Sequence, residues 1–221
     1  ENSIYKTRAF LRLMGLNPTP SAFFVYPGAS GTRFAHSLGT LHLAAIVMEN
    51  LASRHRWPEE VARNVRLAAL LHDIGHGPFS HTFDKFLSTQ GNPTNAGAKL
   101  DHERIGFFLL KNDREIRRVI PERKRLLEIS YLAWGEEKLV SCGVSKVEVK
   151  NLKRRRPYLQ VLSEIVHGKP HCVDILDFLV RDSHNTGVEY GLIDIKRLLL
   201  FADIFRGSLA LDRRTFEAYE A

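Results

Sequence analysis

The chain has 221 residues, of which 44% are hydrophobic and 26% charged, as is typical of a globular protein with one buried core. No apolar run approaches the roughly 20 residues that cross a bilayer, and the first twelve residues lack the apolar region of a signal peptide, so we expect no membrane segment and a cytoplasmic location. The formal net charge of +7 suits anionic partners such as nucleotides or nucleic acid, and the two cysteines exclude a disulfide framework. Because the chain begins with Glu1 rather than Met, we expect a processed or trimmed form.

Helical periodicity dominates the chain. Apolar residues recur at three- and four-residue steps over 38–51 and give one apolar face. Pro58, followed by two glutamates, marks the start of a second helix, which reaches His72 and must end soon after at two glycines and a proline. The same periodicity predicts helices over five later segments, namely 102–111, 121–134, 158–166, 173–183 and 194–205.

Three segments depart from the helical pattern. Residues 88–99 are expected to form a polar loop, and residues 140–152, which alternate apolar and polar positions, a small β-hairpin or an ordered loop. Leu209 and Leu211 alternate with small residues and indicate a short strand near the C-terminus. We therefore expect an all-α helical bundle in a single domain over 1–221, with a small irregular or β insertion around 135–156.

Five aromatic residues are expected chiefly in the core of this bundle: Phe23, Phe24, Tyr26, Phe34 and Phe79.

A basic run precedes Pro157. A run of this kind is usually a solvated loop, but the segment 146–156 is also the candidate contact for nucleic acid. Its cationic residues are Lys146, Lys150, Lys153, Arg154, Arg155 and Arg156.

Histidines and an aspartate gather where the second predicted helix ends. His72, His76 and His81 fall within ten residues, and Asp73 follows His72 directly. An imidazole nitrogen beside a carboxylate oxygen suits borderline metals such as zinc, iron, manganese, nickel or cobalt. A His-Asp dipeptide is also common by chance, and a core histidine beside a helix-ending aspartate is the ordinary alternative.

Other segments supply residues of the same chemical kind. His36 follows Arg33 at the start of the first amphipathic helix, and Asp174, Asp177 and Asp182 lie on a later apolar helix. Buried carboxylates are costly unless they bind a metal or a cation. Their spacing lets the three aspartates share one helix face, although a capped, solvated face explains Asp177 equally well.

Four ordered motifs carry a resemblance to a known superfamily. The strings are RFAHSLG (33–39), HDIGHGPFSH (72–81), HE (102–103) and VDILDFLVRDSHNTGV (173–188). They resemble the HD-superfamily phosphohydrolases, and specifically the SAM-and-HD-domain type of deoxynucleoside triphosphate triphosphohydrolase, from about residue 26 to 205. The resemblance implies an HD-domain helical bundle, a nucleotide or other phosphorylated substrate, and a homo-oligomer.

The resemblance also implies roles for individual residues. It makes His36, His72, Asp73 and Asp174 the ligands of a divalent transition metal (Zn, Fe, Mn, Ni or Co), with Mg as a second ion; spacing alone does not choose Asp174 over Asp182. It places His76, His81 and His102 on the phosphate side, with His102 as general acid and Asp84 orienting it. It matches Arg33 to a phosphate-contacting arginine and Asp182 to an aspartate that contacts the sugar. The position of Tyr190, after the RDSHNTG stretch, makes it a further candidate substrate contact.

Departures from the family pattern bear on the substrate. The family carries a lysine directly after the fourth ligand and a tyrosine four residues after that ligand, where this chain has Ile175 and Phe178. A nucleoside-recognising glutamine-leucine pair is replaced near Pro18 and Thr19. The replacements remove a phosphate cation and a sugar-stacking hydroxyl, so the hydrolytic centre is specified better than the substrate.

These residue types predict metal-dependent hydrolysis of a phosphoester or phosphoanhydride, most readily in a nucleotide. Arg33 and a cationic His76 or His81 are expected to neutralise phosphoryl charge, and His102 to protonate the leaving oxygen. The same centre also suits a phosphodiesterase or a nucleotide monophosphatase. Two further hypotheses are a catalytically weak module that binds nucleotides or nucleic acid, and a di-iron oxygenase in which His76 and His102 supply extra ligands.

Overall fold

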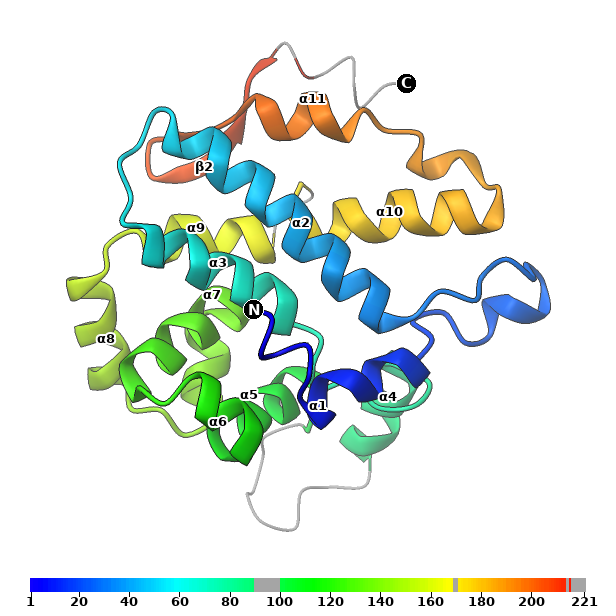
Figure 1. The fold of residues 1–221 in the computed structure, drawn as a ribbon, viewed down its shortest axis with the longest axis horizontal. Coiled ribbons are helices and arrows are strands. Elements are labelled where there is room, and N and C mark those ends of the chain that lie inside the picture. Colours follow the sequence, from blue (N-terminus) through cyan, green and yellow to red (C-terminus); the bar gives the residue numbers. More distant parts are fainter. Residues whose placement is uncertain (90–99, 169–170, 214, 216–221) are drawn as a thin grey trace.

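A computed structural model describes residues 1–89, 100–168, 171–213 and 215. The predicted loop over 88–99 therefore lies almost entirely outside the described residues. Five helices make up the body of the molecule, and α2 packs against α3 and α10 while α7 packs against α3 and α9 (Figure 1). Their bounds are α2 Arg33–Ala52, α3 Glu59–Leu71, α7 Arg123–Ser141, α9 Leu159–Val166 and α10 Val173–Thr186.

Shorter elements surround this body, and most of them contribute residues to the same apolar core. Among the described residues, no helix combines the length and the apolar character that crossing a lipid bilayer requires. The all-α class is confirmed, since the described part contains a single two-stranded sheet. The shorter elements are α1 Arg8–Leu11, η1 Arg12–Gly15, η2 Ala22–Phe24, α4 His81–Thr89, α5 His102–Asn112, α6 Arg114–Val119, α8 Lys146–Arg155, η3 Glu189–Gly191, α11 Ile195–Leu200, β1 Ala202–Phe205 and β2 Ser208–Leu211.

The segment 140–152 is not a hairpin or a loop. It contains the end of α7 and most of α8, so the expectation of β-structure or a loop there is wrong. The Ser145 side chain caps α8 by accepting a hydrogen bond of 3.1 Å from the Glu148 N–H. The helix buries Val149 and leaves Val147 69% exposed, whereas a strand would place both valines on one face. The single-domain organisation over 1–221 and the insertion around 135–156 stay predictions.

The strand predicted near the C-terminus is confirmed as β2, which pairs antiparallel with β1 from Ala202↔Leu211 to Phe205↔Ser208. The helix predicted over 194–205 is wrong beyond Leu200, because its last residues form β1. Arg206 and Gly207 join the strands with φ values of 51° and 79°. A two-residue turn with both φ values positive matches the twist of a hairpin.

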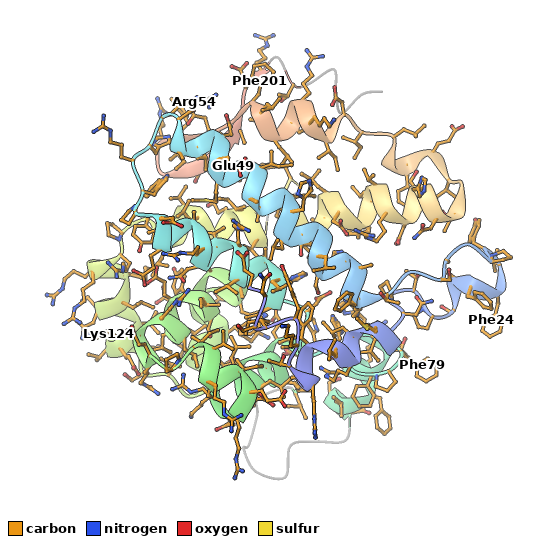
Figure 2. All side chains as sticks on the ribbon, viewed as in Figure 1. Phe24, Glu49, Arg54, Phe79, Lys124 and Phe201 are labelled. Atoms are coloured by element: carbon orange, nitrogen blue, oxygen red, sulfur yellow. The ribbon has the colours of Figure 1, made fainter. Side chains whose placement is uncertain are left out.

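Four of the five aromatic residues expected in the core are exposed instead. Phe34 packs against the core as expected, but Phe24 is 86% and Phe79 66% exposed, and both project from the body in Figure 2. The remaining two, Phe23 and Tyr26, are also exposed. The segment around η2 loops away from the helices, between Pro20 and Pro27, so its aromatic rings cannot reach the core.

Candidate metal centre

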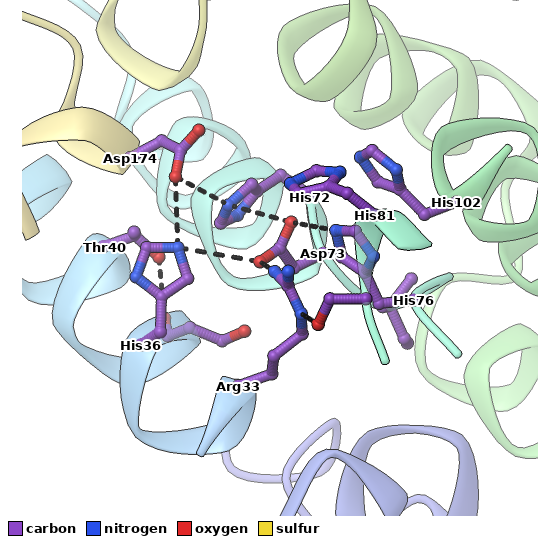
Figure 3. Close-up of polar contacts among 12 residues, drawn as sticks. Arg33, His36, Thr40, His72, Asp73, His76, His81, His102 and Asp174 are labelled. Carbon is purple, nitrogen blue, oxygen red and sulfur yellow. Dashed lines mark hydrogen bonds and ion pairs between the residues drawn. The ribbon is translucent and has the colours of Figure 1, made fainter. Parts of the chain in front are cut away.

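Three parts of the chain bring candidate ligands to one place (Figure 3). Thr32 caps α2 by accepting a hydrogen bond from the Ala35 N–H, and this puts His36 on the first helical turn. His72 and Asp73 follow the last residue of α3, and Asp174 lies in the first turn of α10. His36 and Asp174 are 138 residues apart in sequence, yet their side chains are in contact.

The candidate ligand atoms lie at short range of one another. Asp174 Oδ1 is 3.1 Å from His36 Nε2 and 3.5 Å from His72 Nε2. The Asp73 carboxylate is 3.4 Å from His72 Nε2 and 3.6 Å from His36 Nε2. Atoms bound about 2.1 Å from one ion are separated by distances of this size. His36, His72 and Asp174 therefore offer ligand atoms that could hold one ion, and Asp73 lies beside them with its two oxygens facing different histidines.

The state of His72 fits a metal ligand. Its Nδ1 lies 2.7 Å from the carbonyl of Ala69, to which it donates. Its Nε2 is then a lone-pair nitrogen, which is buried without a hydrogen-bond partner and faces Asp73 and Asp174. A buried polar atom with no partner requires an explanation, and a cation among these two carboxylates supplies one.

The charges of the candidate ligands also favour a bound cation. Burial lowers the pKa of His36, but hydrogen bonds to Asp174 and Asp177 outweigh burial and raise the pKa to about 10. Burial raises the pKa of Asp174, but its contacts with the His36 and His72 rings outweigh burial and hold the pKa well below its usual range. The carboxylates are therefore anionic at neutral pH and attract either protons onto His36 or a metal ion.

A second cluster lies beside the first and contains the four predicted catalytic residues. His102 Nδ1 donates to Asp84 Oδ2 over 2.7 Å, and the His81 ring lies 3.4 Å from the same oxygen. The His76 and His102 rings stack with centroids 3.7 Å apart. Burial raises the pKa of Asp84, but the hydrogen bond to His102 outweighs it and lowers the pKa overall. Asp84 therefore stays anionic and fixes the His102 ring.

His76 lies where its expected positive charge is disfavoured. It is fully buried, and burial lowers its pKa to about 4 despite the neighbouring Asp73. A neutral His76 near pH 7 would leave His81 as the cation of the pair expected to neutralise phosphoryl charge. Arg33 and His81 remain as candidate phosphate cations.

Arg33 is buried at the junction of the two clusters. Its Nη1 donates to Asp73, and its Nε donates to the Ser80 hydroxyl over 3.0 Å. The Ser80 hydroxyl in turn donates to the carbonyl of Asn17, and Phe79 and Ser80 both have left-handed backbones with φ of 61° and 52°. Non-glycine residues adopt this conformation at a cost, and here it turns Ser80 towards Arg33.

A cavity of about 320 Å³ opens from the metal-ligand group. Of the predicted substrate contacts, Arg33 and Asp182 line it, and Tyr190 does not line it in the described part of the chain. Tyr190 is 54% exposed, and partial burial, followed by the charge of Asp182, raises its pKa. A larger cavity of about 730 Å³ lies between α7 and α8, away from both clusters. The cavity of about 320 Å³ beside the metal-ligand group is lined by Pro18, Thr19, Arg33, His36, His81, Asp174, Phe178, Arg181 and Asp182.

Asp177 was left between two explanations, and Arg12 and Trp134 were not predicted to act at the site. Asp177 is 7% exposed and contacts His36, so its solvated-face explanation is wrong. Arg12 donates to the carbonyls of Ile74 and His76 and holds the loop after α3, and Trp134 donates its indole N–H to the His72 carbonyl over 2.9 Å. The four-residue spacing from Asp177 to Arg181 was a local signal for the first, but the sequence carries none for the other two.

Comparisons with known proteins agree with this arrangement. The HD domain profile matches residues 33–140. The uncharacterized protein YwfO of Bacillus subtilis (strain 168) is 31% identical over 198 residues, and the human deoxynucleoside triphosphate triphosphohydrolase SAMHD1 is 32% identical over 211 residues. These alignments cover 87% and 91% of this chain, which spans only 38% and 33% of the two relatives.

Solved structures show the same kinship. A phosphohydrolase from Bacteroides thetaiotaomicron VPI-5482 superposes with a TM-score of 0.72 at 28% identity, and the match covers 99% of this chain and 46% of that one. A hypothetical protein from Aquifex aeolicus superposes with a TM-score of 0.73 at 27% identity. Together with the profile match and the paired histidine and aspartate after α3, these relatives establish that the chain is a member of the HD-domain superfamily.

Proposed function

We propose that this chain hydrolyses a phosphoanhydride or phosphoester bond of a nucleotide, with a divalent transition metal held by His36, His72, Asp73 and Asp174. The close approach of two imidazole nitrogens and two carboxylates supports this proposal most directly, because His36 and Asp174 of this group line a cavity. The human relative is named as a deoxynucleoside triphosphate triphosphohydrolase and the Bacteroides neighbour as a phosphohydrolase, which supports the reaction class.

The metal ion and the charged side chains have separate proposed roles in the reaction. When bound, a divalent metal lowers the pKa of a water ligand and polarises a phosphoryl oxygen. Mg remains the candidate for a second ion. Arg33, fixed between Asp73 and Ser80, offers a preorganised positive charge to the phosphate, and His81 at the cavity wall offers a second polar contact.

His102 is the proposed general acid. Because its Nδ1 donates to Asp84, its Nε2 is free to carry the proton that the leaving oxygen needs. The neutral His76 ring stacks on His102 and limits its rotation. These residues thus hold and transfer a proton on the phosphate side of the site.

The residues that line the cavity restrict the range of candidate substrates. Asp182 is proposed to bind a sugar hydroxyl and Tyr190 to meet the substrate outside the cavity, while Phe178 offers an apolar wall where the family has a tyrosine hydroxyl. A deoxynucleoside triphosphate is the first candidate substrate. A phosphodiester and a nucleoside monophosphate are the alternative substrates that the same centre serves.

A nucleotide panel tests the proposal. The purified protein is assayed for bound metal and for release of phosphate, pyrophosphate and triphosphate, beside the double variant His72→Ala with Asp73→Ala. We expect about one equivalent of metal and a turnover that the double variant loses, and the released anion identifies the bond cleaved. Metal without turnover would favour a nucleotide-binding module, and absence of both would refute the proposed centre.

The basic helix α8 supports a second, independent activity, which is nucleic-acid binding by 146–156. Lys146, Lys150 and Arg154 recur at four-residue steps on one helix face, and none of them forms an ion pair within the described part of the chain. Charge reversal at Lys150 and Arg154 should abolish salt-dependent binding of a single-stranded oligonucleotide without changing nucleotide hydrolysis. A homo-oligomeric state and a cytoplasmic location complete the proposal.

A further inference from the structure

Asp177 connects α10 to the ring of His36. Its Oδ2 accepts a hydrogen bond of 2.7 Å from His36 Nδ1. Arg181, one turn further along α10, donates from Nε and Nη2 to the two oxygens of the same carboxylate, each over 2.8 Å. The Asp177 side chain is 8% exposed, so water has little access to this chain of contacts.

These contacts decide which nitrogen of His36 meets the candidate metal. A ring that donates from Nδ1 to a carboxylate presents Nε2 as its ligating atom, and a partner of this kind fixes both the tautomer and the ring orientation. His36 Nε2 is the atom that faces Asp174 and Asp73. The bidentate contact from Arg181 prevents the Asp177 carboxylate from rotating away from His36.

Gly39 provides the space for this arrangement. It lies on α2, three residues after His36, in the interior of a 20-residue helix. A Cβ atom at this position would lie 1.8 Å from Asp177 Oδ1 and 2.4 Å from Arg181 Nη2. Glycine is unfavourable in a helix interior, so its presence in α2 calls for a reason. The close approach of the Asp177–Arg181 pair supplies that reason.

We infer that Gly39, Asp177 and Arg181 form a positioning unit that holds His36 in its metal-ligating state; the inference rests on the metal centre proposed above. Asp177 acts through His36 and Gly39 acts through Asp177. The competing explanation is that Asp177 and Arg181 form an ordinary ion pair within α10 that stabilises the helix alone. That explanation gives Gly39 no influence on metal binding.

Gly39→Ala separates the two explanations because it leaves His36, Asp177 and Arg181 chemically unaltered and acts only by displacing the Asp177 carboxylate. The atoms that a Cβ would meet are the ends of two flexible side chains, so the methyl group should displace the carboxylate and leave the packing of α2 on α10 intact. The matched control is Gly15→Ala, because a Cβ at Gly15 meets nothing within 4 Å. Circular dichroism and thermal unfolding check that each variant folds.

The probe is Co²⁺, whose affinity is measured by competition with a chromophoric chelator and whose ligand set is read from its visible absorption. We expect Gly39→Ala and Asp177→Ala each to weaken Co²⁺ binding by about 10- to 100-fold, the range for loss of an orienting partner, and Gly15→Ala to have no effect. Because both changes remove one contact, the double variant Gly39→Ala with Asp177→Ala should bind Co²⁺ no more weakly than Asp177→Ala.

Two results would overturn the inference while leaving the metal centre intact. One is wild-type Co²⁺ affinity in folded Gly39→Ala, and the other is additive loss in the double variant, which would show that the two residues act separately. Absence of Co²⁺ binding by the unaltered protein is a different outcome, which would refute the proposed metal centre and this inference together.

Discussion

Trp134→Phe should destabilise the protein through one hydrogen bond at the candidate site. The Trp134 indole is buried, and its N–H satisfies the carbonyl of His72, the residue that directly follows α3. Phenylalanine keeps an aromatic ring there but leaves that carbonyl without its donor. An unsatisfied buried polar group costs about 1–3 kcal/mol, which for a chain of this length is a fall in Tm of roughly 2–4 °C per kcal/mol.

A second tryptophan provides the control for this substitution. The indole N–H of Trp57 is buried without a hydrogen-bond partner in the described residues, so Trp57→Phe makes the same loss of volume without losing a bond. Urea unfolding with chelator present gives both free energies of unfolding without a contribution from metal binding. We expect Trp134→Phe to cost about 1–3 kcal/mol more than Trp57→Phe. Equal costs would refute the reasoning.

Three further predictions concern the pH response, the proton donor and α8. The pKa of His36 is raised from 6.5 to about 10, so its stabilising contribution to the metal-free protein is full below about pH 6.5 and is lost as pH rises to about 10. Urea unfolding should therefore show a free energy of unfolding that decreases across this pH range. The His36→Ala variant should lack this decrease. Asp84→Asn leaves His102 without its carboxylate partner and should lower kcat by about 10²- to 10⁴-fold, with metal content unchanged. An unaltered kcat in folded Asp84→Asn would show that the His102–Asp84 pair does not act as the general acid. Ser145→Ala removes the cap of α8 and should lower the free energy of unfolding by about 1 kcal/mol, whereas Ser141→Ala, near the end of α7, serves as a control outside α8.

Local spacing identifies only the part of the site in which residues are neighbours in the sequence, such as the adjacent His72 and Asp73. His36, Asp84 and Asp174 are identified by the family resemblance. Asp177 meets His36 across 141 residues, and Arg12 meets His76 across 64. Such contacts depend on how helices pack, and no periodicity of a single segment encodes them.

The fold errors have local causes. The valines around 147 suggested strand alternation, while Ser145, followed three residues later by Glu148, has the sequence spacing of a helix start. The apolar run that follows Asp194 satisfied helical periodicity beyond Leu200, but the Arg206–Gly207 turn lets its last residues pair as a hairpin. In both segments the residues at the ends of the element were more informative than the apolar pattern within it.

The 138-residue separation between His36 and Asp174 also concerns the lifetime of the protein. An ion shared by these two residues would act as a reversible cross-link across most of the chain. Cross-linking a loop of about 100 residues restricts the unfolded chain by roughly 4–5 kcal/mol in the entropy model. Loss of the ion would therefore lower the free energy of unfolding and raise the population of unfolded chain that proteases can cleave. Metal supply would then set the abundance of the protein as well as its activity.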